Sequence, residues 1–124
     1  MHLGDPAREV RQARSVVEPV AGYRRLYRTV DPLEAFDIFT SGRLRPALGQ
    51  EGKYFFVSLE HARELGPKFE SIGLGAAYRV VSATIAEEDL ALAVPISNAG
   101  EGPGYFVPED LLDSMTNLMW HDER

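Results

Sequence analysis

The hydrophobic and polar positions of the chain follow two periods, and each period predicts one kind of element. Residues 23–30, Tyr-Arg-Arg-Leu-Tyr-Arg-Thr-Val, alternate with period two and carry aromatic and β-branched side chains, which is typical of a strand. Leu26, Arg28 and Val30 share one face of this strand. Burying an arginine between two apolar neighbours is costly unless an anion meets it, so Arg28 is the first candidate for a functional role.

Apolar residues recur every three or four positions in two segments of the first half. Within residues 1–20 this spacing predicts an amphipathic N-terminal helix over 6–18, with Asp5 as its N-cap. The run 31–34, Asp-Pro-Leu-Glu, is the signature of a second helix start, and Gly42 supplies a left-handed stop. The apolar stripe of this second helix consists of Leu33, Phe36 and Phe39.

Short strands and helical segments alternate after a predicted loop over 43–53. Residues 54–57 are predicted as an aromatic strand, followed by a helix that Ser58 caps and that Gly66 and Pro67 end. The remaining predicted elements are strands over 76–85, 90–96 and 105–107, a helical turn over 108–112 and an apolar tail over 115–120. Because strands outnumber helices after residue 22, and the helices fall between the early strands, we predict an α+β fold.

The composition fits one small domain spanning residues 1–124. Apolar residues make up 44% of the chain, enough for a single hydrophobic core at this length. The absence of cysteine excludes disulfides, thiolate catalysis, and zinc–thiolate and iron–sulfur sites. No apolar run approaches the ~18 residues that span a membrane, and the amino terminus lacks the apolar core of a signal peptide, so we expect a soluble protein without membrane contact.

The formal net charge of −6 is unevenly distributed. Residues 1–50 carry eight arginines and no lysine against six carboxylates, a balance of +2, whereas residues 51–124 carry five basic and thirteen acidic groups, a balance of −8. A surface-wide basic footprint for nucleic acid is therefore absent. Arginines of the first half can still gather into a local anion site; they include Arg24, Arg25, Arg28, Arg43 and Arg45.

Several polar residues have a sufficient structural explanation. The cap accounts for Ser58 and is worth about 1 kcal/mol. His61 lies on the helix that follows without a second His, Ser or Asp at interpretable spacing, which favours a solvated histidine over a catalytic one. The acidic run 87–89 favours a solvated turn, because adjacent residues rarely converge on one metal ion. We therefore predict no metal site.

Three segments follow one another along the chain: LYRTV (26–30), GKYFFVSLEHARELG (52–66) and GEGPGYFVPEDLL (100–112). In this order they resemble the mono-ADP-ribosyltransferase superfamily as it occurs in small bacterial toxin domains. The second is the most specific, since no generic fold demands a Gly-Lys-aromatic strand, a Ser cap and an Ala-bearing helix together. The resemblance covers residues 23–113 and implies a split antiparallel β-sheet with flanking helices, preceded here by the N-terminal helix, with NAD bound in the cleft of the sheet.

The resemblance also implies roles for particular residues. Cleavage of the nicotinamide–ribose bond passes through an oxocarbenium-like state, which needs a cation for the phosphates, an aromatic wall and a carboxylate. Arg28 would grip the phosphates or the ribose, Tyr54 and Phe55 would form the stacking wall, and Ser58 would support the cleft while capping its helix. Without the resemblance, Tyr54 and Phe55 are better explained as ordinary core.

The catalytic carboxylate is the point at which this chain departs from the family. The family places a Glu immediately before or within the last strand, where this chain has Gly104. Glu101 lies three residues upstream in a glycine-rich loop, and Glu109 lies beyond Pro108. We expect Glu101 to be the catalytic carboxylate, because the loop can swing it over bound NAD.

The predicted function is therefore that of a toxin-type enzyme that consumes NAD, either by ADP-ribosyl transfer to a macromolecular acceptor or by hydrolysis. We expect it in the cytoplasm, or secreted as part of a larger toxin, and we expect a cognate neutralising protein as a partner. The alternative is a non-catalytic acidic binding module, a toxin-neutralising protein or an inactive transferase scaffold, whose −8 half would make association fast and salt-sensitive.

Overall fold

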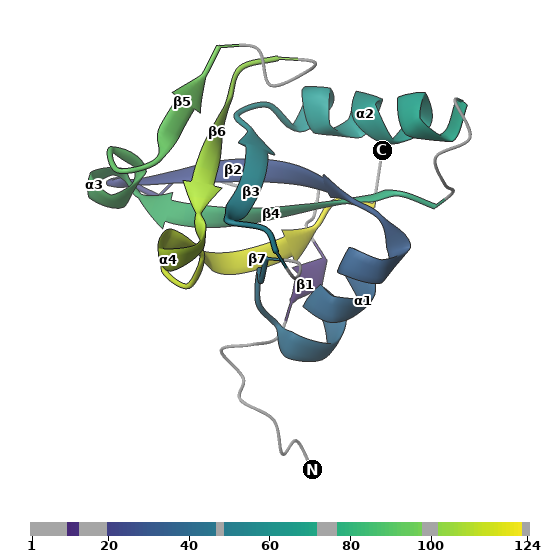
Figure 1. Ribbon diagram of the computed structural model, residues 1–124, viewed down its shortest axis with the longest axis horizontal. Coiled ribbons are helices and arrows are strands. Elements are labelled where there is room, and N and C mark those ends of the chain that lie inside the picture. The colour runs from purple at the N-terminus through teal and green to yellow at the C-terminus, as the bar shows by residue number, and fades with distance from the viewer. Residues whose placement is uncertain (1–9, 13–19, 47–48, 72–76, 98–101, 123–124) are drawn as a thin grey trace.

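The chain forms a mixed β-sheet with helices on both faces (Figure 1), in a computed structural model that describes residues 10–12, 20–46, 49–71, 77–97 and 102–122. The strands are β1 (Arg11–Gln12), β2 (Tyr23–Val30), β3 (Gly52–Phe56), β4 (Arg79–Ala86), β5 (Val94–Ile96), β6 (Gly104–Pro108) and β7 (Thr116–Trp120). The helices are α1 (Pro32–Ser41), α2 (Leu59–Ser71), α3 (Glu87–Leu90) and α4 (Glu109–Leu112). The predicted α+β class is confirmed. None of the described helices is long and apolar enough to cross a membrane.

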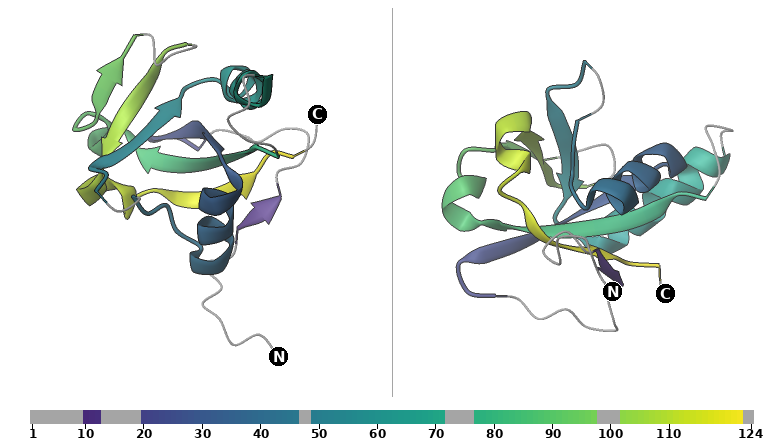
Figure 2. Two further views of the ribbon diagram at one scale, coloured as in Figure 1. Left: turned by 45° about the vertical axis from the view of Figure 1, so that its right-hand side comes forward. Right: turned by 90° about the horizontal axis from the view of Figure 1, so that it is seen from below.

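The sheet has two parts that meet at one residue pair. Its strand order is β1-β7-β4-β2-β3-β6-β5, and all neighbours are antiparallel except β1 and β7, which are parallel. β2 and β4 pair at eight positions and β3 and β6 at five, but β2 meets β3 only where Tyr27 lies opposite Phe56. Beyond this pair, β3, β5 and β6 turn away from β4 and β7 (Figure 2, left). We call β3, β5 and β6 the smaller part of the sheet, and β1, β2, β4 and β7 the larger part.

Helix α1 begins directly after β2 and is capped at both ends by the residues that the sequence predicts. Asp31 caps the helix by accepting a hydrogen bond from the Glu34 amide at 2.8 Å, and Gly42 ends it with φ 69°. The strand over 23–30 and this helix are therefore confirmed. The buried residues of α1 are Ala35 and Ile38. The predicted stripe faces away from the core and consists of Leu33, Phe36 and Phe39.

The predicted N-terminal helix is wrong where the structure describes it. Arg11 and Gln12 form β1 and pair in parallel with β7, so the main chain is bonded to a sheet edge rather than to its own preceding turn. The remainder of that prediction falls largely on residues 1–9 and 13–19, which lie outside the described residues.

Gly66 and Pro67 do not end α2, which continues to Ser71. Proline lacks the amide that would bond the carbonyl four residues earlier, which is why a stop was predicted there. The turn after Pro67 is held by packing instead, because the Phe69 ring lies 5.3 Å from the Tyr78 ring. Two smaller differences concern the predicted strand over 90–96, which begins only at Val94, and the apolar tail, which contributes β7.

The hydrophobic core lies on both faces of the larger part of the sheet. On one face, Leu26 and Val30 of β2 pack with the buried residues of α1 and with apolar side chains of β3, β4, β6 and β7. On the other face, Ala62 of α2 packs with Phe56 and Val80. β4 is buried along most of its length, as expected for a central strand covered from both sides. Helices α1 and α2 thus cover opposite faces of β2.

Replacing Asp31 with alanine is expected to lower the free energy of unfolding by about 1 kcal/mol, because the Glu34 amide loses its acceptor at the start of α1. Urea denaturation at pH 7, followed by circular dichroism, measures the change. Asp113→Ala is a matched control, since Asp113 is an exposed aspartate at the end of α4 and its loss should change stability by less than ~0.5 kcal/mol. Equal losses in the two variants would contradict the capping role.

Candidate functional site

The candidate site lies where β2 and β3 diverge, and Arg28 occupies this junction. Its Nε and Nη2 donate to the two carboxylate oxygens of Glu34 at 2.7 and 2.9 Å, and its Nη1 donates to the main-chain oxygen of Tyr54 at 2.9 Å. The anion that an arginine on an apolar face requires is therefore Glu34, from the first turn of α1. Arg28 ties β2 to α1 and to the smaller part of the sheet at once.

Lys53 is the second cation at this junction. Its Nζ lies 2.9 Å from Glu34 Oε2, and its side chain is only 2% exposed. Lys53 was predicted in a loop, but β3 begins at Gly52 and includes it. We call Arg28, Glu34 and Lys53 the junction cluster. With both bases protonated, it carries one net positive charge.

The charges of the junction cluster shift the ionisation of its members. Burial alone would raise the pKa of Glu34, but the hydrogen bond and the charge of Arg28, together with Lys53, outweigh burial and hold that pKa below its ordinary value. Burial lowers the pKa of Lys53, and the positive charge of Arg28 lowers it further, against the attraction of Glu34. Glu34 is therefore a carboxylate at neutral pH.

The two predicted stacking residues lie on opposite faces of β3. The Tyr54 side chain is 56% exposed and packs edge-on against Phe106, with ring centroids 4.9 Å apart. Phe55 is 1% exposed and belongs to the core, so it is not accessible for stacking. Phe55 is therefore corrected to a core residue. Tyr54 meets Arg28 through its main-chain oxygen, and its exposed ring lies on the face of β3 opposite Lys53 and Phe55.

Ser58 and His61 lie together at the start of α2. The Ser58 hydroxyl accepts from the His61 amide at 3.4 Å, which is the predicted capping position. The His61 ring is half-buried against Gly102, where an added Cβ would lie 2.5 Å from Nδ1. That Nδ1 is buried and has no hydrogen-bond partner among the described residues. His61, predicted to be solvated, thus packs against the residue that follows Glu101; Glu101 itself lies outside the described residues.

Gly104, at which the resemblance would place the catalytic carboxylate, is the first residue of β6. It pairs with Phe56, and a Cβ at Gly104 would lie 2.0 Å from the carbonyl oxygen of Phe55. β3 and β6 are therefore too close together to accommodate any side chain at this point. The backbone, and not only the residue type, excludes a carboxylate here.

A second polar cluster lies on the α2 face of the larger part of the sheet. Arg25 Nη1 donates to Ser82 Oγ at 2.8 Å and to the main-chain oxygen of Asn117 at 2.9 Å, and Ser82 Oγ lies 2.6 Å from His121 Nε2. Because Ser82 accepts from Arg25, its own proton is available to His121. Burial, Arg25 and Arg63 lower the pKa of His121 to about 4, so the imidazole is neutral at pH 7. Ser82 is fully buried, which makes this network structural rather than nucleophilic.

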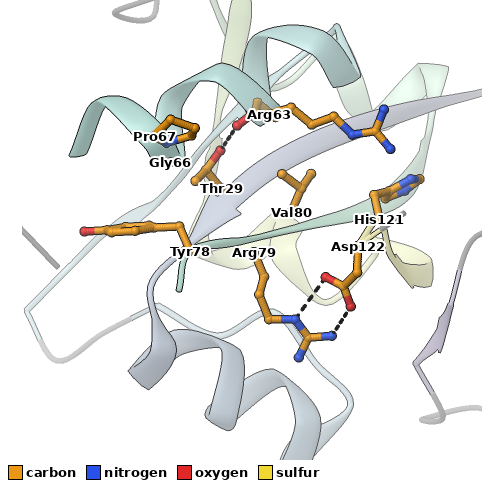
Figure 3. Close-up of a pocket in the computed structure, with 10 residues that line it drawn as sticks. Thr29, Arg63, Gly66, Pro67, Tyr78, Arg79, Val80, His121 and Asp122 are labelled. Carbon is orange, nitrogen blue, oxygen red and sulfur yellow. Dashed lines mark hydrogen bonds and ion pairs between the residues drawn. The ribbon is translucent and has the colours of Figure 1, made fainter. Parts of the chain in front are cut away.

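A pocket of about 90 Å³ adjoins His121 between α2 and the start of β4 (Figure 3). Arg79 and Asp122 in this pocket are paired with each other at 2.6 Å, and the Thr29 hydroxyl donates to the main-chain oxygen of Ala62. Sites for cofactors commonly enclose roughly 300–1,000 Å³. This pocket is therefore too small for a dinucleotide.

A more open pocket of about 330 Å³ borders both parts of the sheet. It is lined by Arg24 of β2, Pro95 of β5 and Tyr105 of β6, together with residues of α3 and the turn that follows. Neither of these two pockets includes Arg28 or Tyr54. Of the sequence-predicted residues, the structure joins Arg28 to the main-chain oxygen of Tyr54, but not to its ring, and places Ser58 at the start of α2. Among the described residues, no three His, Asp or Glu side chains cluster closely enough to hold a metal ion.

Comparisons with protein-family models, with curated proteins and with solved structures gave no match. The resemblance to the ADP-ribosyltransferase superfamily therefore depends on the three sequence segments alone.

Two residues of the junction were missed from the sequence. Glu34 was assigned only to the start of α1, although a helix that begins directly after a strand can fold its first turn back over that strand. Lys53 stands two residues before Phe55, and this period-two spacing is the signal that places it on the core-facing side of β3. Both signals are weak until the pairing of β2 with β3 is known.

Replacing Glu34 with glutamine is expected to lower the free energy of unfolding at pH 7 by about 3–5 kcal/mol, because two largely buried cations lose their shared anion. The native pKa of Glu34 is below its ordinary value of 4.5, so its stabilisation is complete above pH 4.5 and is lost as the pH falls through the native pKa. Urea denaturation at several pH values should show the gap between wild type and Glu34→Gln narrowing in acid.

The control for this measurement is Asp37→Asn, which breaks the more exposed ion pair with Arg45 and should cost less than about 1 kcal/mol. A gap between wild type and Glu34→Gln that stays constant from pH 7 to pH 3 would show that the charge of Glu34 is not what stabilises the junction.

Replacing Gly104 with alanine is expected to cost more than about 4 kcal/mol of stability, because the new methyl group overlaps the Phe55 carbonyl. Gly22→Ala is the control: Gly22 has φ 83° and no atom within 4 Å of an added Cβ, so only the backbone cost of about 1–2 kcal/mol applies. Thermal denaturation of both variants makes the comparison, and a Gly104→Ala protein as stable as Gly22→Ala would disprove the close approach of β3 and β6.

Proposed function

We propose that this chain is a mono-ADP-ribosyltransferase-type domain that binds NAD beside the junction cluster and cleaves the bond between nicotinamide and ribose. ADP-ribose then passes to a macromolecular acceptor or to water. The proposed fold is the split antiparallel sheet of that family. Its support is that all strand pairs within residues 23–113 are antiparallel and that β2 and β3 meet only at Tyr27 and Phe56.

The position of Arg28 is the observation that carries the proposal. A guanidinium has five N–H donors, and three of those of Arg28 are engaged by Glu34 and by the main chain of Tyr54. Two donors remain for a phosphate oxygen. The net positive charge of the junction cluster favours a dianionic diphosphate in a protein whose total charge is −6.

Tyr54 supplies the aromatic surface in this proposal. Its ring is exposed, and Phe106 holds it edge-on, so one face is available to stack on the nicotinamide ring. Phe55 supports β3 from the core side. Ser58 fixes the start of α2 beside the junction and makes no contact with NAD in this assignment.

The cleavage step requires a carboxylate close to the ribose, and neither Glu34 nor position 104 supplies it. The C–N bond to the ribose breaks, its electron pair leaves with nicotinamide, and the positive charge that develops on the ribose is stabilised by a nearby anion. Glu34 is already neutralised by two cations, and Gly104 admits no side chain. We therefore assign this role to Glu101, which also receives the proton that the acceptor hydroxyl or water loses as it adds to the ribose.

One observation favours a second candidate function. The close approach of β3 and β6 at Gly104 removes the family's catalytic position, as expected of an inactive transferase scaffold or an acidic binding module that binds without cleaving. In that case a cognate partner, for example a toxin that this chain neutralises, replaces the macromolecular acceptor.

The proposal is tested by measuring NAD binding by calorimetry and NAD consumption by the release of nicotinamide, with and without a bacterial lysate as a source of acceptors. We expect Arg28→Lys to lower kcat/KM at least about tenfold, because a lysine keeps the charge but loses the two-pronged contact. Glu101→Gln should still bind NAD and no longer cleave it. Arg45→Lys is the matched control and should behave as the wild type, since the Arg45 side chain is 53% exposed and pairs with Asp37 rather than with a member of the junction cluster.

The possible outcomes separate the two candidate functions. A wild-type protein that binds NAD through Arg28 but never releases nicotinamide is the non-cleaving scaffold. A wild-type protein that does not bind NAD at all, or whose turnover is unchanged in Arg28→Lys, refutes the proposed site.

A further inference from the structure

The outer face of α1 is apolar, and its side chains are exposed in the part of the chain that the structure describes. Leu33, Phe36 and Phe39 are 75%, 69% and 73% exposed, whereas Ala35 and Ile38 on the opposite side belong to the core. A surface helix normally turns polar residues to solvent. In α1, by contrast, apolar side chains lie on the outer face as well as on the core face. The three side chains, which we call the α1 patch, expose roughly 400 Å² of apolar surface, as much as the largest patch on a typical monomer, which is often a binding site.

We propose that a second copy of this chain covers the α1 patch, with the two α1 helices packed antiparallel about a two-fold axis that passes through Phe36. A two-fold interface joins the same surface of both copies, so one self-complementary stripe is sufficient. The patch has this property, because Leu33 and Phe39 are each three residues from Phe36. Leu33 then lies against Phe39 of the partner subunit, and the two Phe36 rings meet on the axis.

The charges at the ends of α1 favour this antiparallel arrangement. Asp31 is exposed at the start of the helix, and Arg43 is exposed just beyond its end. Antiparallel packing brings Asp31 of one copy close to Arg43 of the partner subunit, and it also places the two helix dipoles in their favourable opposed orientation. Parallel packing would bring like charges together.

The remaining carboxylates of α1 would not repel a second copy, because each is already in an ion pair. Glu34 is engaged by Arg28 and Lys53 on the inner side of the helix, and Asp37 is paired with Arg45. The uncompensated charges at the rim of the α1 patch are therefore Asp31 and Arg43, which balance each other, although the whole chain is acidic. A strongly acidic or strongly basic partner would find no complementary surface there, whereas a second copy presents one charge of each sign in the matching positions.

The size of the α1 patch predicts how strong the association is. A standard interface buries about 800 Å² on each partner, and the patch supplies roughly half of that before Pro32 and Thr40 at its rim are included. We therefore expect a concentration-dependent dimer rather than a permanent one. This inference does not depend on NAD binding, but the same helix holds Glu34, so dimerisation would brace the element that positions Arg28.

Sedimentation velocity and light scattering, from about 1 µM to about 1 mM protein, test the proposal. The mass of the wild type should rise from one copy towards two, whereas Phe36→Asp should remain monomeric throughout. Leu92→Asp is the matched control, because Leu92 is 68% exposed and lies outside α1, and it should dimerise as the wild type does. Circular dichroism and thermal denaturation confirm that the variants are folded, as expected for exposed positions.

The absence of cysteine allows a second measurement that reports the geometry. Phe36→Cys introduces the only thiol, and oxidation should cross-link two copies rapidly, because residues on a two-fold axis bring their Cα atoms within the ~7 Å that a disulfide spans. Leu92→Cys should cross-link much more slowly. A wild type that is monomeric up to 1 mM, or a dimer that survives in Phe36→Asp, overturns the proposal.

Discussion

The carboxylate of Glu34 lies between two cations at the one place where α1, β2 and β3 meet, and the division of the sheet depends on this ion cluster. Because β2 and β3 diverge after a single residue pair, main-chain N–H and C=O groups beyond it lack the interstrand hydrogen bonds that a continuous sheet would provide. Arg28 replaces part of that ladder, because it donates to the main chain of β3 while its other nitrogens hold Glu34. Apolar side chains could fill the same wedge, but they could not satisfy the Tyr54 carbonyl. The cluster thus supports both the divergence of the strands and the attachment of α1.

The same cluster determines the charge that the junction presents. Its carboxylate neutralises only one of two positive charges, and Lys53 is too deeply buried to meet a ligand directly. The remaining charge is therefore presented through Arg28, which connects β2 to the main chain of β3. An anion bound there would compete with no protein group for the two uncommitted donors. A partly buried arginine can thus connect α1, β2 and β3 and still keep two N–H donors uncommitted.

Local patterns predicted the elements well, and long-range pairing accounts for what they missed. The alternation over 23–30 and the cap, proline and glycine around α1 each act within a few residues, so they can be recognised without tertiary information. The register of β3 against β6 and the meeting of Glu34 with Lys53 join residues far apart in sequence, and no local signal encodes them.

The helical spacing before residue 20 failed at Arg11 and Gln12 because an available sheet edge on β7 outweighed a marginal helix. Pro67 was read as a stop by its lost hydrogen bond, whereas the packing of Phe69 on Tyr78 decided the outcome. The exposed position of the α1 stripe also required the fold, since periodicity identifies an apolar face but not what it contacts.

The close contact of Gly104 with the Phe55 carbonyl constrains the mutational paths open to this sequence. A side chain at position 104 is not one substitution away, because the backbones of β3 and β6 would have to separate before any larger residue could be accepted. Changes elsewhere in these two strands must therefore come first, and each of them would need to be tolerated without benefit from the new residue. Selection acting one step at a time would more readily recruit a carboxylate from the adjoining loop than place one on the strand. The order in which substitutions can accumulate is thus determined by a steric contact between two main chains.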